Sequence, residues 1–132
     1  MIAGLMGGCT APASLPASEI TFLYTTNTHA YTEPCGCCAE QAGGLSSRAN
    51  YISSQQDRLK QAQATPGLVL DTGGFSDNSS DLKQIKSVYT SRAMELIGYD
   101  AVNVGGNEIK LGQELLFNVL DGFESTQVVS AN

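Results

Sequence analysis

The sequence predicts an α/β protein built on a parallel β-sheet. Three observations indicate this class: short β-rich runs, longer segments with apolar residues at helical spacing between them, and the resulting order β-α-β-α-β-α-β. Connections of helical length favour parallel strands, because a right-handed crossover between such strands needs about a dozen residues or more. A chain of 132 residues suits one domain of this kind.

The first strand and the first helix follow residue 19. Residues 20–27, ITFLYTTN, are a β-rich run that ends in polar residues, which is typical of a buried strand. The apolar residues of the next segment recur at helical spacing: Leu45, Ala49, Ile52 and Leu59. An amphipathic helix is therefore expected over 44–63. A Pro-Gly break then precedes a second buried strand at 68–71.

The second half of the chain repeats this alternation. Residues 76–81, SDNSSD, form a turn and helix-capping stretch. The apolar positions of the helix that follows are Ile85, Val88, Tyr89, Ala93, Leu96 and Ile97. Gly98 is expected to end this helix. A third strand at 100–106, a third helix at 112–120 and a fourth strand at 126–131 complete the pattern.

Charge and hydropathy exclude two classes of partner. The net charge is −6, with seven basic and thirteen acidic residues, and the basic residues form no cluster. Nucleic acids and anionic membrane surfaces are bound through lysine and arginine, so neither is an expected partner. No apolar run approaches the roughly 20 residues that a membrane-spanning helix requires. Contact with a membrane is therefore expected only through a lipid anchor.

The N-terminal segment, residues 1–18, differs in kind from the rest. It is uncharged apart from its terminus and rich in Gly, Ala, Ser and Pro, so we interpret it as a signal remnant followed by a lipoprotein linker. Met6-Gly7-Gly8-Cys9 resembles a bacterial lipoprotein box, which makes Cys9 the candidate lipidation site. The alternative is a terminus with a stray free cysteine. A lipoprotein would be extracytoplasmic, in the periplasm or on the cell surface, where thiols can oxidise.

Polar and glycine-rich segments follow the first three predicted strands. Ligands of open parallel sheets collect at the carboxyl ends of the strands, so these segments are expected to meet at one rim. They are 27–38, 71–80 and 105–112. Asp71 is expected to accept hydrogen bonds from turn amides after its strand. Glu108 and Lys110 are expected to be solvated rim charges, and Arg48 to pair with a carboxylate or to lie on a solvated helix face.

The order of these segments resembles the N-terminal half of the calcineurin-like metallophosphoesterase domain of 5′-nucleotidases. The matching motifs are TTNTH at 25–29, GGLSSR at 43–48, DTGG at 71–74 and GGNEIKLG at 105–112. The resemblance covers 19–132 and implies an incomplete domain, half of a metallophosphatase-type α/β sandwich.

The resemblance also implies a two-metal centre, which this sequence matches poorly. Such a centre needs anionic oxygens and imidazoles to hold the cations that activate water. His29 stands where a ligand is expected, whereas Asn27 replaces an aspartate and is a weaker candidate. The other substituted ligand and catalytic positions are Gly74, Gly106, Asn107 and Lys110. A conventional nucleotidase is therefore not expected, and a divergent metal-dependent 5′-nucleotidase, with zinc or manganese, is the alternative.

The thiol cluster EPCGCC departs from the ordinary nucleotidase pattern. It is similar to a divergent bacterial branch that includes the UshA-like (seleno)protein group and metallophosphatase-like domains associated with multihaem cytochromes. The residues that carry this likeness are Tyr31, Glu33, Pro34, Cys35, Gly36, Cys37, Gly43, Gly44 and Leu45.

Three interpretations of these thiols stay open. Cys35 and Cys38 have the C-x-x-C spacing of redox-active pairs. Cys35, Cys37 and Cys38 together could instead hold copper or zinc, with His29 as a fourth ligand. A structural disulfide with one spare thiol is the third interpretation.

The expected function is that of a degenerate extracytoplasmic metallophosphoesterase-like domain whose thiols are redox-active or bind a soft metal. A structural accessory domain of a redox protein is a further alternative. Four strands of half a sheet leave an edge and one face poorly covered, so self-association or a redox protein partner is expected.

Overall fold

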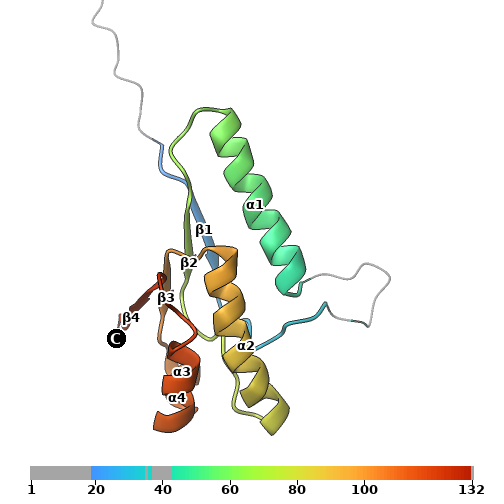
Figure 1. Ribbon diagram of the computed structural model, residues 1–132, viewed down its shortest axis with the longest axis vertical. Coiled ribbons are helices and arrows are strands. Elements are labelled where there is room, and N and C mark those ends of the chain that lie inside the picture. The colour runs from blue at the N-terminus through green and yellow to red at the C-terminus, as the bar shows by residue number, and fades with distance from the viewer. Residues whose placement is uncertain (1–18, 35, 37–42, 132) are drawn as a thin grey trace, which may run out of the picture.

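The computed structural model describes residues 19–34, 36 and 43–131. Within them one sheet is formed by four parallel strands in the order β1-β2-β3-β4 (Figure 1). The strands are β1 Phe22–Thr25, β2 Leu68–Asp71, β3 Ala101–Asn103 and β4 Gln127–Val129. The α/β class and the parallel sheet are therefore confirmed.

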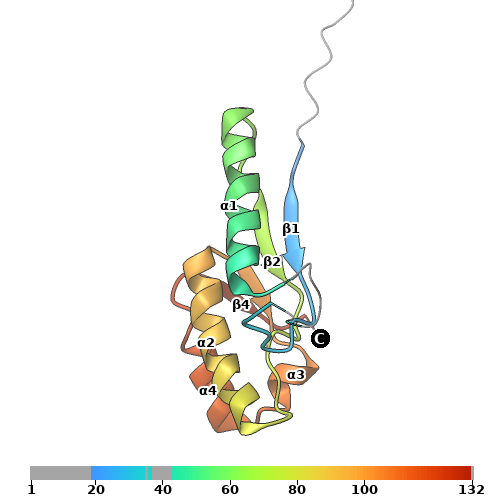
Figure 2. The same cartoon turned by 90° about the vertical axis from the view of Figure 1, so that its right-hand side faces the viewer.

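The long helices cover one face of this sheet. Figure 2 shows α1 (Leu45–Gln61), α2 (Asp81–Ile97) and α4 (Gln113–Leu120) together on the same side of the strands. A short helix, α3 (Gly106–Ile109), follows β3 at the carboxyl end of the sheet. It was not predicted, because four residues are too few to show a helical period. No helix in the described part of the chain is long and apolar enough to cross a membrane.

The hydrophobic core lies between the sheet and these helices. Val69 and Val102 project from the central strands toward Ile52 of α1 and Met94 of α2. The other buried members of the core are Phe75, Tyr99, Leu111 and Val119. Successive strand residues point to opposite faces, so only every second residue of each strand reaches this core.

Two glycines mark helix boundaries: Gly44 precedes α1 and Gly98 follows α2. Gly44 precedes α1 with φ of 80°, and a Cβ there would lie 2.9 Å from the backbone nitrogen of Pro34. Only glycine therefore fits at this point. Gly98 ends α2 in the left-handed conformation, as expected, while Ser80 caps its N-terminus by accepting from the amide of Lys83 at 3.3 Å.

Glu95 joins the end of α2 to the loop that leads into β4. Its carboxylate accepts from the amides of Ser125 at 3.0 Å and Thr126 at 3.1 Å. The hydroxyls of the same two residues also donate to it. These bonds, with the Ser125 hydroxyl first, lower the pKa of Glu95 from 4.5 to about 2.

Replacing Glu95 by Gln should therefore make the stability of the folded state depend less on pH in the acid range. A carboxylate with a lowered pKa stabilises the folded state fully above its unfolded-state value, and this stabilisation is lost as the pH falls toward about 2. We expect Glu95→Gln to lower the thermal midpoint at neutral pH, with the difference from wild type shrinking below pH 4.5. Scanning calorimetry across pH measures this. Glu114→Gln, on an exposed side chain, is the control, and a difference that does not change with pH would contradict the prediction.

Candidate functional site

The loops after β1 and β2 are held together by their backbones. The amides of Asn27, His29 and Ala30 donate to the carbonyls of Gly73, Gly74 and Phe75 at 2.9, 2.9 and 2.8 Å. This short ladder continues the pairing of the two strands beyond the sheet. It brings the TTNTH and DTGG motifs side by side at the rim.

The loop after β1 has an unusual backbone conformation. Asn27, His29 and Ala30 have φ values of 50°, 47° and 50°, in the left-handed region that non-glycine residues rarely adopt. Each such residue costs on the order of 1 kcal/mol or more and persists only where its surroundings enforce it. Here the ladder to residues 73–75 provides that enforcement. Such strain is concentrated at functional sites in proteins, which makes this loop the first candidate.

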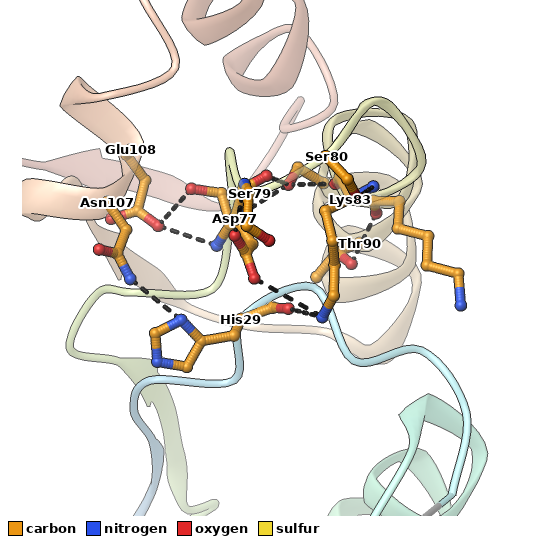
Figure 3. Close-up of polar contacts among 11 residues, drawn as sticks. His29, Asp77, Ser79, Ser80, Lys83, Thr90, Asn107 and Glu108 are labelled. Atoms are coloured by element: carbon orange, nitrogen blue, oxygen red, sulfur yellow. Dashed lines mark hydrogen bonds and ion pairs between the residues drawn. The ribbon is translucent and has the colours of Figure 1, made fainter.

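Glu108 joins the loops of the rim through its carboxylate (Figure 3). Its side chain is fully buried. One carboxylate oxygen accepts from the amides of Gly74 at 3.0 Å and Gly105 at 2.9 Å. The other accepts from the amide and the hydroxyl of Ser76 at 2.9 and 2.8 Å. The expectation of a solvated rim charge was wrong, because glycine-rich loops present unpaired amides that this carboxylate satisfies.

Asn27 occupies the space beside Gly74. A Cβ at position 74 would overlap Oδ1 of Asn27 and lie 3.1 Å from its Cα. Gly74 also has φ of 75°, which disfavours any other residue. Position 74 therefore cannot carry a ligating side chain while Asn27 stays where it is.

His29 and Asn107 meet across the rim. The amide nitrogen of Asn107 lies 3.2 Å from Nδ1 of His29 (Figure 3). An amide nitrogen can only donate, so Nδ1 accepts and the ring proton of neutral His29 lies on Nε2. In this tautomer the lone pair of Nδ1 is directed at the amide of Asn107.

A pocket of about 500 Å³ opens beside this pair. It is lined by His29, Asp77, Asn78, Ser79, Asn107 and Lys110. Lys110, as expected, is exposed to solvent. The pocket thus combines a histidine, amides, a hydroxyl and one charge of each sign, which suits a polar ligand better than an apolar one.

Lys83 of α2 fixes the wall of this pocket. Its ammonium donates to the carbonyl of His29 at 2.6 Å and pairs with Asp77 at 3.7 Å. It also lies 3.4 Å from the centroid of the Tyr31 ring. Hydrogen bonds from Ser79 lower the pKa of Asp77, which keeps the ion pair charged. One cation therefore holds the loop after β1 against the start of α2.

A second polar cluster lies between β1, β2 and α1. Asp71 accepts from the hydroxyl of Thr25 and, as expected, from the turn amide of Gly73 at 2.8 Å. Burial raises the pKa of this carboxyl above 3.8. Arg48 lowers this pKa electrostatically, but it forms no ion pair with a carboxylate among the described residues, and its Nη1 is buried without a hydrogen-bond partner.

The described residues do not fit a two-metal centre. Among them no group of three or more His, Cys, Asp or Glu side chains could hold a metal ion. Asn27 is neutral, Gly74 and Gly106 have no side chain, and His29 alone of these positions carries a strong metal-ligating group. Cations that activate water for phosphoester hydrolysis need several anionic ligands, which these positions lack.

The predicted thiol ligands, Cys35, Cys37 and Cys38, lie outside the described residues, as does Cys9. Both ends of the segment that contains the three thiols are nevertheless defined. The amide of Leu45 donates to the carbonyl of Thr32 at 3.0 Å, and Gly44 lies against Pro34. The segment therefore leaves and rejoins the domain at one place, directly after the loop that carries His29.

Sequence reasoning missed Glu108, Ser76 and Lys83 as determinants of the site. Their roles depend on partners far along the chain, such as Glu108 with Ser76 and Lys83 with His29. One signal was available for Glu108: it closely follows the glycine pair Gly105-Gly106, whose amides need an acceptor.

Comparison with solved structures places this fold among phosphoesterases. No protein-family model matches the sequence, and no curated protein matches it. A 5′-nucleotidase precursor from Thermus thermophilus superposes with a TM-score of 0.68 at 29% identity, over 86% of this chain and 22% of that one. The NAD nucleotidase of Haemophilus influenzae gives a TM-score of 0.67 at 20% identity, over 86% of this chain and 20% of that one.

A calcineurin-like phosphoesterase from Bacillus subtilis gives a TM-score of 0.62 at 20% identity, over 86% of this chain and 36% of that one. The chain thus spans from about a fifth to about a third of the length of these proteins. It has the fold of part of a metallophosphoesterase-type α/β domain, as the order of its motifs predicted.

The tautomer of His29 tests the geometry of the rim. We expect nitrogen NMR to find the neutral ring protonated on Nε2, and Asn107→Asp to move the proton to Nδ1, because a carboxylate accepts where the amide donated. The assignment is direct, since the chain contains one histidine. Asn78→Asp adds the same charge to the same pocket without touching the ring and should leave the tautomer unchanged. A wild-type ring protonated on Nδ1 would contradict the arrangement.

Proposed function

We propose that this chain is a degenerate, extracytoplasmic metallophosphoesterase-like domain that does not carry out conventional two-metal hydrolysis. The observation that carries the proposal is the contact between Asn27 and Gly74, where a Cβ at position 74 would overlap the amide oxygen of Asn27. The position at which the nucleotidase pattern has a bridging aspartate is therefore without a side chain, and a Cβ there would require Asn27 to move.

The rest of the rim supports the same conclusion. Metal-dependent hydrolysis depends on anionic ligands that hold cations against the reacting phosphoryl group. The carboxylate nearest to the loops, Glu108, is buried and fully used by four backbone and hydroxyl donors. Asp77 is paired with Lys83. Neither carboxylate is free to replace the missing ligands.

A divergent metal-dependent 5′-nucleotidase is the second candidate. It is favoured by the 29% identity to the Thermus thermophilus 5′-nucleotidase precursor and by the retention of His29. In that case, ligands would have to come from a partner or from residues outside those described, with zinc or manganese as the cation.

An assay for the release of phosphate from nucleotides distinguishes the two proposed functions. We expect purified, folded protein to release no phosphate from nucleotides above the background of manganese or zinc alone, because the rim lacks anionic ligands. His29→Ala is the matched control: a metal-dependent rate in wild type that falls about 100-fold or more in this variant would establish the enzyme and overturn the proposal. A rate unaffected by the substitution would identify a contaminating phosphatase.

The thiol cluster is the second part of the proposal. Cys35 and Cys38 are proposed as a redox pair, with Cys37 adjacent, as in the UshA-like and cytochrome-associated branch that the segment resembles. The hydrogen bond between Leu45 and Thr32 supports this, because it brings the described residues on either side of the thiols together. Cys9 is proposed as the lipid anchor, and an electron-exchanging protein as the partner. An accessory domain with a structural disulfide, and a copper or zinc site, are the competing outcomes.

Thiol titration distinguishes these outcomes. Oxidation of a pair removes two thiols, two protons and two electrons, so we expect the reversible loss of two thiols per chain at a defined potential. Cys35→Ser and Cys38→Ser should each abolish it, while Cys37→Ser should not. Stoichiometric copper or zinc that disappears in Cys37→Ser would indicate a metal site instead. Thiols that do not titrate between reducing and oxidising buffers would contradict the redox proposal.

A further inference from the structure

A short segment, residues 30–34, connects His29 at the rim to the start of the thiol cluster. Lys83 of α2 is attached to both ends of its first half. The ammonium donates to the carbonyl of His29 at 2.6 Å and lies 3.4 Å from the centroid of the Tyr31 ring (Figure 3). The Lys83 side chain is 19% exposed, so these contacts are partly shielded from water, which strengthens them.

Lys86 extends this attachment toward the thiols. It follows Lys83 by about one helical turn and pairs with Glu33 at 3.7 Å. Between these contacts, the carbonyl of Thr32 accepts from the amide of Leu45 at 3.0 Å. The connecting segment is therefore held between the start of α1 and the first turns of α2.

The backbone where this segment begins depends on these contacts. His29 and Ala30 have φ of 47° and 50°, a conformation that non-glycine residues keep only while their surroundings enforce it. Their amides are bonded to the loop after β2, whereas the carbonyl of His29 is bonded to Lys83. From this backbone the ring of His29 reaches the amide of Asn107 at 3.2 Å. The direction of the ring therefore depends on the position of the Lys83 ammonium.

We propose that Lys83 couples the connecting segment to the rim, so that a displacement of the segment changes the contact between His29 and Asn107. One ammonium binds both the Tyr31 ring and the His29 carbonyl, so a movement of the ring draws on the bond that holds the strained backbone. Lys83 is thus a positioning residue for the rim pocket.

The link to the thiols rests on the proposed function. Cys35 follows Glu33 by two residues, so forming or breaking a bond at the thiols supplies the displacement. Coupling of this kind is reciprocal. A polar ligand that binds in the pocket beside His29 and prefers one arrangement of the ring therefore changes the reduction potential of the thiols.

NMR of the His29 ring in the full chain tests the coupling, since the chain contains one histidine. The spectra are recorded in reducing buffer at about pH 9, where an imidazole with a usual pKa of about 6.5 is neutral. Glu33→Lys places a like charge beside Lys86 and should shift the nitrogen signals of the ring. Asp57→Lys makes the same change of charge in the exposed ion pair with Lys60 on α1 and should leave them unchanged.

Two further variants distinguish the coupling from a direct effect of charge. Lys83→Met removes the ammonium, and Tyr31→Leu, at an exposed position, removes only the ring that the ammonium contacts. In either background Glu33→Lys should cause no further shift of the His29 signals, whereas the field of a new charge would still act. Circular dichroism confirms that each variant is folded. A shift that persists in both backgrounds, or no shift in the wild-type background, would overturn the proposal.

Oxidation of the thiols gives a separate measurement. We expect the His29 signals to move on oxidation in the wild-type chain and to stay in Lys83→Met, although both lose two thiols. Signals that move equally in both chains, or in neither, would contradict the coupling of the thiols to the rim. If no thiols are lost, the redox function fails, and the response to Glu33→Lys still decides whether Lys83 couples the segment to the rim.

Discussion

The rim of this domain depends on one buried carboxylate. Glu108 joins the loop after β2, through Gly74 and Ser76, to the loop after β3, through Gly105. Because His29 donates its amide to Gly74, the loop after β1 is attached to the same group. Burying a carboxylate costs several kcal/mol unless hydrogen bonds replace its water, and here four donors do so. The left-handed backbone at Asn27, His29 and Ala30 persists because hydrogen bonds attach it to this framework.

The elements with a periodic pattern of apolar residues were predictable from the sequence. Strands and long helices follow from local periodicity, and glycines such as Gly98 end them for steric reasons visible in a single position. Short α3 was not predictable, because a four-residue helix has no period. Glu108 was misinterpreted for a different reason. Its burial depends on donors up to 34 residues away, and an acidic residue in a polar segment looks solvated until those donors are located.

The sequence predicted several of the residues of the candidate site but only part of their arrangement. The order of the motifs correctly placed His29 and Asn107 on one rim, although they lie 78 residues apart. The hydrogen bond between them, and the ion pair of Lys83 with Asp77, depend on side-chain directions that motif spacing does not contain. Likewise, the substitution at Gly74 was visible in the sequence, whereas its cause in the position of Asn27 was not.

The contact between Asn27 and Gly74 makes the order of evolutionary change matter. A carboxylate introduced at position 74 meets the amide of Asn27 and a backbone suited to glycine, so the change is harmful by itself. The Oδ1 of Asn27 has to move aside first, and its Cα lies close enough to need a small shift against the ladder to residues 73–75. A carboxylate at position 74 is therefore tolerated only after, or together with, a change at position 27. The two positions are coupled, so the effect of a substitution at one depends on the residue present at the other.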